Sequence, residues 1–335
     1  MKASLISKIV VLLCVLCLVL SYFTTDRHKP YMENTKNNKN FVSAANKIAV
    51  IELDGAIASS SDSSFFSKEA NATNLLKSLK LAKEDKDING VILKINSPGG
   101  TVAMSQNIYN EIIKTREIKP VISVLDDVAA SGGYYIASAT DRIIAQEGTL
   151  TGSIGVIFSF MDYHNLLINK LNINQIVIKS GKFKDIGSST REMLPEEKAL
   201  MQEIVDDSYQ QFLDAITKGR ILREEKDYPV VKTNLTNDDL KTYADGRVFT
   251  GKRAKSLGFV DENGDMDTAK TMITTMAQEK FKNKLPVKLV NYNKKSSFNE
   301  YFSSLAEYSS QGNIKIKDII PTSMLLNRKP LYLWE

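Results

Sequence analysis

The chain has 335 residues, of which 43% are hydrophobic and 25% are charged, which is typical of a folded globular protein. Its formal net charge is +5, but residues 1–46 hold six Lys or Arg against two Asp or Glu, so the remainder is nearly neutral. A neutral body argues against a nucleic-acid-binding protein, because that class needs a basic surface. The only cysteines are Cys14 and Cys17, so the body has no disulfide, thiol nucleophile or zinc–thiolate site.

Residues 9–25 form a run of 17 residues without a charge, preceded by Lys2 and Lys8. A helix of this length spans roughly 25 Å, at the short end of what crosses a bilayer. We predict an uncleaved membrane anchor over residues 1–25, because no small-residue cleavage site follows the run. A secretory signal peptide is the alternative. The two lysines favour a cytoplasmic N-terminus, which places the body on the extracytoplasmic side.

After a flexible tether at residues 26–46, short apolar runs alternate with helical patterns, which predicts a mostly parallel sheet with crossover helices. The predicted strands lie at Lys47–Leu53, 90–96, 120–125, 141–146, 152–158 and 174–179. The predicted helices lie at Ala72–Lys83, 101–115 and 195–219. The α/β pattern resumes over Ala244–Asp261, and the tail from about Val287 is irregular.

Two glycine-rich turns each follow a predicted strand and open a helix. One contains Gly99 and Gly100, and the other is Ala129-Ala130-Ser131-Gly132-Gly133. Either turn alone is also explained by close packing, since glycines let backbones approach. Together they fit acyl transfer, in which one turn exposes a hydroxyl and the other aims backbone amides at the developing oxyanion.

A serine nucleophile needs a base, and the chain offers only two histidines. His28 lies in the tether, and His164 reads as a surface residue at the start of a short helix. A lysine base is therefore favoured. Its reference pKa is ~10.4, so its surroundings must lower that pKa by about 3 units to keep the amine neutral near pH 7. Lys179, Lys182 and Lys184 are the candidates, and composition does not choose among them.

Four motifs, INSPGG, AASGGYYIA, TLTGSIGV and KSGKFKDIGS, occur in this order. They resemble the short form of the signal peptide peptidase SppA family from about Lys47 to at least Asp261. The resemblance implies an α/β ClpP/crotonase-like fold of repeated ββα units over residues 47–285, after one transmembrane helix and before a C-terminal extension at 286–335. It implies a serine endopeptidase in the bacterial inner membrane, homo-oligomeric, degrading cleaved signal peptides without a metal or other cofactor.

The same resemblance assigns roles to five residues. Ser131 matches the nucleophile, Lys184 matches the general base, and Ser153 matches the hydroxyl that orients the lysine amine. Gly100 and Gly132 match the backbone donors of the oxyanion hole. Both members of the dyad are expected to come from one chain.

Two other functions remain open from the sequence: a crotonase-like acyl-CoA enzyme and a non-enzymatic, membrane-tethered assembly factor. The apolar C-terminus, residues 331–335, is predicted to dock against the body. It would act there as a lock or self-inhibitor near a substrate groove, or simply pack on its own protomer.

Overall fold

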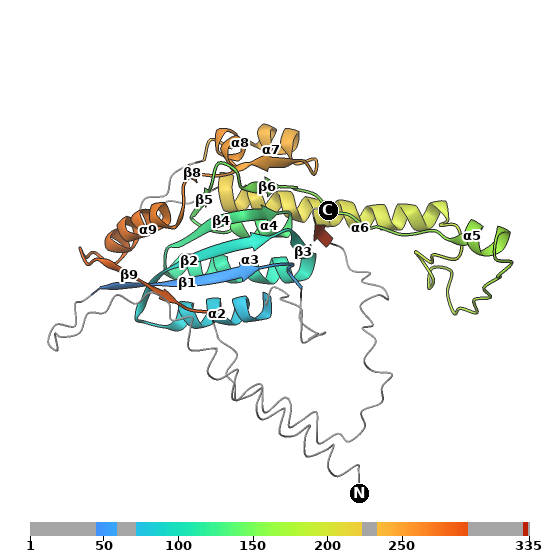
Figure 1. Ribbon diagram of the computed structural model, residues 1–335, viewed down its shortest axis with the longest axis horizontal. Coiled ribbons are helices and arrows are strands. Elements are labelled where there is room, and N and C mark those ends of the chain that lie inside the picture. Colours follow the sequence, from blue (N-terminus) through green and yellow to red (C-terminus); the bar gives the residue numbers. More distant parts are fainter. Residues whose placement is uncertain (1–44, 59–71, 223–232, 294–330, 334–335) are drawn as a thin grey trace, which may run out of the picture. The chain divides into compact units, whose positions relative to one another are not determined.

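The computed structural model describes residues 45–58, 72–222, 233–293 and 331–333, all within one compact unit, Ala44–Glu335 (Figure 1). The predicted anchor at 1–25 and nearly all of the tether at 26–46 lie outside the described residues. Within the described ranges, no helix combines the length and the apolar character needed to cross a bilayer.

The fold is built on an eight-stranded sheet with the strand order β7-β6-β4-β2-β1-β9, in which β5 pairs with both β4 and β8. Every pairing in it is parallel except that of β6 with β7. Its strands are β1 (Asn46–Asp54), β2 (Ile88–Ser97), β4 (Val121–Ala130), β5 (Arg142–Ala145), β6 (Leu150–Gly152), β7 (Val248–Thr250), β8 (Glu262–Asn263) and β9 (Val287–Asn291). A second, two-stranded sheet pairs β3 (Gly99–Thr101) with β10 (Leu331–Leu333).

Helices lie on both faces of the large sheet (Figure 1). One face is covered by α2, α3 and α4, and the other by α9. The helices are α2 (Ala72–Glu84), α3 (Val102–Ile118), α4 (Gly132–Ala137), α5 (His164–Asn169), α6 (Pro195–Ile216), α7 (Asn237–Tyr243), α8 (Gly251–Ser256) and α9 (Met266–Lys280), with a π-helical turn, η2 (Thr217–Ile221), after α6.

Side chains that alternate in direction along the strands fill two hydrophobic clusters, one on each face of the sheet. Ile48 and Ile92 point into the smaller cluster with Ile273 of α9, whereas their neighbours Ala49 and Leu93 belong to the larger cluster beneath α2 and α3. Because successive strand residues face opposite sides, a continuous apolar run fills two layers at once. Full burial of each such isoleucine or leucine contributes roughly 1.5–3 kcal/mol.

Most predicted strands and helices are confirmed, but three regions differ. The predicted strand at 152–158 is wrong apart from its first residue, because β6 covers Leu150–Gly152 and residues 153–158 form no strand. Residues 174–179 form no strand, since no neighbouring backbone pairs with them within the described residues. The tail contains β9, which pairs with β1, so the sheet continues beyond the predicted boundary at residue 285.

Candidate active site

The two glycine-rich turns meet at the carboxyl ends of three adjacent strands. Strand β4 pairs with β5 in its first half and with β6 at its end, where Ala130 lies opposite Gly152. On its other side Ala129 lies opposite Ser97, the last residue of β2. This register brings the turn after β2, the turn after β4 and the end of β6 together at one edge, where open α/β sheets place ligands.

Ser131 occupies a strained turn between β4 and α4. Its φ of 52° and ψ of −117° are rare for a residue with a side chain, and such strain costs of order 1–3 kcal/mol. Its backbone N–H donates to the carbonyl oxygen of Gly152 (2.8 Å), and its own carbonyl accepts from Tyr135 (2.8 Å). The side chain is fully buried, and its Oγ has no hydrogen-bond partner in the described structure.

Gly100 and Gly132 lie against each other beside this serine. A Cβ on Gly132 would stand 3.1 Å from the Gly100 nitrogen and 2.7 Å from the Ser105 Oγ. Ile57 donates to the carbonyl of Gly99 and accepts from the N–H of Thr101, both at 2.7 Å. Because polar groups alternate along an extended strand, the N–H of Gly100 faces the opposite edge of β3. Both glycines are thus required by packing and also leave backbone donors near Ser131.

Ser153 directly follows the residue that accepts the Ser131 N–H. It has a φ of 50°, is nearly buried, and donates its backbone N–H to the carbonyl oxygen of Arg247 (2.8 Å). The structure therefore brings four of the five sequence-predicted site residues to one place: Gly100, Ser131, Gly132 and Ser153.

Lys184 is not brought to this place. It lies in the segment between α5 and α6, which Figure 1 draws at the end of α6 remote from β3 and α4. The other two candidate lysines form ion pairs there: Lys179 with Asp185 (2.5 Å) and Lys182 with Glu196 (3.2 Å). The Lys184 amine has neither a hydrogen bond nor an ion pair with any described residue. It is therefore the unpaired amine among the three.

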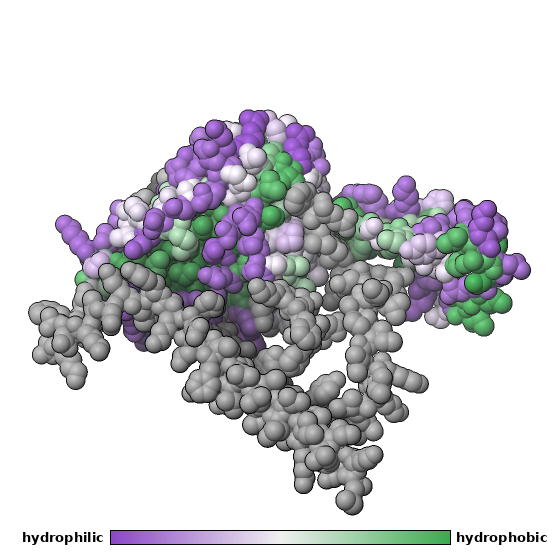
Figure 2. All heavy atoms as spheres, viewed as in Figure 1, coloured by the Kyte–Doolittle hydropathy of each residue, from purple (hydrophilic) through white to green (hydrophobic). Residues whose placement is uncertain are grey.

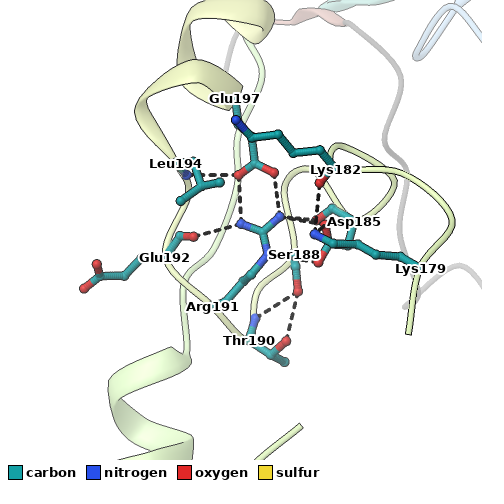
Figure 3. A network of polar contacts seen from close by, with 9 residues as sticks. All are labelled: Lys179, Lys182, Asp185, Ser188, Thr190, Arg191, Glu192, Leu194 and Glu197. Atoms are coloured by element: carbon teal, nitrogen blue, oxygen red, sulfur yellow. Dashed lines mark hydrogen bonds and ion pairs between the residues drawn. The ribbon is translucent and has the colours of Figure 1, made fainter. Parts of the chain in front are cut away.

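Sequence reasoning missed a polar cluster in the same segment, centred on Arg191 (Figure 3). Arg191 binds both oxygens of Asp185 (2.8 and 3.0 Å) and both oxygens of the buried Glu197 (2.5 and 2.8 Å). Hydrogen bonds from Arg191 and Lys179 hold the pKa of the Asp185 carboxyl well below its usual range. The available sequence signal was a glutamate, Glu197, in the first turn of the predicted helix. In the structure its carboxylate accepts the N–H of Leu194 (2.9 Å), as a glutamate at this position of a helix start often does.

His164 is remote from a role at the serine. Its Nδ1 lies 3.2 Å from the carbonyl oxygen of Thr190, in the same segment as Lys184. Within the described residues, no group of three or more His, Cys, Asp or Glu side chains is arranged to hold a metal ion.

The predicted docking of the C-terminus is seen in part. Strand β10 pairs antiparallel with β3, placing Tyr332 opposite Gly100 and Leu333 opposite Gly99, and it also lies beside α4. Trp334 and Glu335 lie outside the described residues. The edge of β3 that carries the Gly100 N–H is thus occupied by an extended segment of the same chain.

Comparisons with known proteins identify the family of this chain. The model of peptidase family S49 matches residues 113–280, and that of Clp protease matches residues 62–146. A Synechocystis sp. protein described as a candidate protease is 40% identical over 70% of this chain and 76% of its own length. A candidate signal peptide peptidase SppA of Enterococcus faecium is 38% identical over 67% of this chain and 61% of its own.

A plant relative and one solved structure were also compared with this chain. The chloroplastic serine protease SPPA of Arabidopsis thaliana is 36% identical over 59% of this chain and 27% of its own length. A variant of the 1510-N membrane-bound stomatin-specific protease is 16% identical, with a TM-score of 0.44, over 74% of this chain and 98% of its own. The family matches do not favour the acyl-CoA enzyme alternative. The chain belongs to peptidase family S49 and is a serine peptidase similar to SppA.

Proposed function

We propose that this chain is a membrane-anchored serine endopeptidase that cleaves extended apolar peptides, with Ser131 as nucleophile and Lys184 as general base. The observation that carries the proposal is the state of Ser131. The residue has a positive φ and lies beside Gly100 and Gly132, and its Oγ is buried without a hydrogen-bond partner in the described structure. A polar side chain in a strained, unsatisfied position is typical of a reacting group.

The mechanism follows from these groups. The Ser131 Oγ attacks the scissile carbonyl carbon while its proton passes to the neutral amine of Lys184. The oxyanion is stabilised by the N–H groups of Gly100 and Gly132, and the lysine ammonium then protonates the leaving amine, which releases one product. Water hydrolyses the acyl-enzyme after giving a proton to the same amine. Ser153 is proposed to orient the amine through its hydroxyl.

Lys184 is proposed to reach Ser131 from a second copy of the chain. Within one chain the segment that carries Lys184 lies away from the serine, and no contact joins them in the described structure. The site is therefore incomplete without either a rearrangement or a partner. A homo-oligomer supplies the missing amine without moving the folded body.

The surface of the same segment supports association. Apolar side chains gather around α5 and the residues after it (Figure 2). Ile176 is 85% exposed and Ile178 is 97% exposed, in a run whose sequence predicts a strand but whose backbone pairs with no other described segment. A partner that adds a strand here would bury both the side chains and the backbone groups. Monomeric proteins rarely expose such an apolar surface.

Mixing two inactive variants tests where the base comes from. Ser131→Ala and Lys184→Ala chains should each be inactive alone but regain peptidase activity when co-assembled, because one interface then holds both intact groups. A Ser131→Ala chain mixed with a Ser131→Ala/Lys184→Ala chain is the control and should stay inactive. If tagged chains co-assemble and the first mixture also stays inactive, the base does not come from the neighbour.

The substrate is proposed to be a cleaved signal peptide or a similar membrane-associated peptide. Strand β10, with the sequence Leu-Tyr-Leu, shows that the edge of β3 accepts an extended antiparallel segment. Signal peptides have apolar central regions, and the E. faecium relative is described as a candidate signal peptide peptidase. The apolar run at 9–25 would place the body at the extracytoplasmic face of the membrane.

Two measurements test this activity. A fluorophosphonate probe should label the protein at Ser131, whereas the assembly-factor alternative predicts no labelling. A peptide-library digest should then show cleavage within apolar extended peptides. Labelling without any preference for apolar residues near the scissile bond would contradict the substrate class but leave the peptidase intact.

A further inference from the structure

The segment that carries Lys184 contains an ion cluster whose charges cancel. Lys179 and Arg191 supply two positive charges, and Asp185 and Glu197 supply two negative charges (Figure 3). Arg191 joins the two carboxylates, since it is bidentate to each of them. Lys184 lies directly before Asp185 in the chain and has no part in the cluster.

We propose that Arg191 and Lys179 act as positioning residues that occupy the Asp185 carboxylate and so keep the neighbouring Lys184 amine unpaired for its role as base. This inference rests on the proposed function. It assigns a catalytic purpose to a cluster that otherwise reads as a structural ion network.

Without Lys179 and Arg191, the Asp185 carboxylate would be free to pair with the Lys184 amine. A lysine side chain is long enough to reach the carboxylate of the next residue, and an opposite charge within about 4–6 Å holds an amine in its protonated form. A protonated amine cannot accept the Ser131 proton. In the structure both Asp185 oxygens are already taken: Oδ1 by Lys179 (2.5 Å) and Arg191 (2.8 Å), and Oδ2 by Arg191 (3.0 Å).

Glu197 fixes Arg191 in this arrangement. Its carboxylate is fully buried at the first turn of α6, accepts the Leu194 N–H (2.9 Å) and is bidentate to Arg191. The guanidinium also donates to the carbonyl oxygens of Asp185 (3.2 Å) and Glu192 (3.0 Å). The helix start therefore sets the position of Arg191, and Arg191 sets that of Asp185.

Other titratable groups nearby are directed elsewhere. Lys182 pairs with Glu196 of α6, and both side chains are more than half exposed. His164 of α5 contacts the Thr190 carbonyl, and Asp162 accepts the His164 N–H (2.8 Å). Lys198 of α6 lines the adjacent pocket of about 390 Å³ with Arg191 and Asp162. None of these side chains forms a hydrogen bond or ion pair with Asp185 in the described structure, so the carboxylate depends on Lys179 and Arg191.

The pH dependence of kcat/KM separates a positioning role from a merely structural one. Arg191→Gln leaves the cluster with an excess negative charge beside Lys184, so the ascending limb of the profile should move up by about one pH unit. Adding Asp185→Asn to Arg191→Gln removes that charge and should return the limb to the wild-type position or below. A limb that stays in place in Arg191→Gln, with activity lower at every pH, would overturn the inference.

Two matched lysine variants decide the case even if Arg191→Gln does not fold. Lys179→Gln removes one cation from Asp185 and should move the limb up by roughly half a pH unit. Lys182→Gln makes the same change of charge on the same segment but frees only the exposed Glu196, so its limb should not move. Equal shifts in the two variants, or none in either, would overturn the inference.

The proposed function is tested separately in the same assay. Substantial turnover by Lys184→Ala would refute the dyad itself. An inactive Lys184→Ala protein together with an unmoved limb in Lys179→Gln would refute only the positioning role.

Discussion

The backbone N–H of Ser131 donates to the carbonyl oxygen of Gly152 at 2.8 Å, which ties the turn after β4 to the end of β6. This bond continues the parallel ladder one residue past Ala130, so the serine is held by the sheet although its φ is positive. The strain at Ser131 is therefore sustained by regular strand pairing. Ser153 adjoins the accepting residue, so the same bond places its backbone beside Ser131.

The hydroxyl of Ser131 is expected to contribute to activity at the expense of stability. Ser131→Ala should abolish turnover, yet its melting temperature should equal or exceed that of the wild type, because a buried hydroxyl without a partner is unfavourable by about 1–3 kcal/mol. Calorimetry and a peptidase assay measure the two effects.

Ser123→Ala is the matched control, because Ser123 is equally buried but contacts the Thr140 hydroxyl (3.0 Å) and the Arg142 carbonyl (3.3 Å). It should lose about 1 kcal/mol of stability and keep its activity. A Ser131→Ala protein that melts as early as Ser123→Ala would show that the Ser131 hydroxyl has a stabilising partner in solution.

Gly132→Ala should inactivate the enzyme through backbone crowding. The new Cβ would stand 2.7 Å from the Ser105 Oγ and 3.1 Å from the Gly100 nitrogen, so β3 and α4 must separate. We expect a loss of about 1–3 kcal/mol from overpacking and at least a 100-fold loss of kcat from a displaced oxyanion donor. Gly148→Ala meets nothing within 4 Å and should change neither quantity. Retained turnover in Gly132→Ala would contradict the proposed oxyanion hole.

Removing the C-terminal strand should raise the peptidase rate. Residues 331–333 occupy the edge of β3 where an extended substrate would pair, so deleting Leu331–Glu335 should lower KM and raise kcat/KM at low substrate concentration. Tyr332→Pro keeps the chain length but removes a backbone donor, and should act in the same direction. Unchanged kinetics in both variants would mean that β10 does not compete with substrate.

The cluster around Arg191 should make folding sensitive to acid. The side-chain hydrogen bond to Arg191 lowers the pKa of Glu197, and hydrogen bonds from Arg191 and Lys179 lower that of Asp185. Groups with a lowered folded pKa contribute stability above their unfolded values of about 4, and this is lost as pH falls through the folded values.

We therefore expect the acid-unfolding transition, followed by circular dichroism below about pH 4, to move to higher pH in Lys179→Gln. Lys182→Gln removes the same charge from an exposed pair and should leave the transition in place, since such pairs contribute little. Coincident transitions for the wild type and Lys179→Gln would show that the cluster does not contribute to acid stability.

The sequence by itself predicted most of the fold and all five proposed site residues, four of which the structure brings to one place. Apolar runs such as those of β1, β2 and β4 bury residues on both faces and therefore read as parallel strands. The turns carrying Gly100 and Ser131 could be predicted from short stretches of sequence, because each glycine-rich turn directly follows a strand and precedes a helix. The nearness of these turns follows from parallel strands ending at one edge.

Only the tertiary structure decided the rest, because it depends on contacts between residues far apart in the chain. The run at 174–179 has the pattern of a strand, but a strand forms only where another backbone accepts its hydrogen bonds, and within the described residues none does. Likewise, composition could not choose among the three lysines, and only the resemblance to the SppA family selected Lys184. Whether each amine is paired depends on where the fold places Asp185 and Glu196. Among the described residues, Lys179 pairs with Asp185 and Lys182 with Glu196, whereas the Lys184 amine has no such partner, because side-chain pairing depends on which carboxylates the fold brings close.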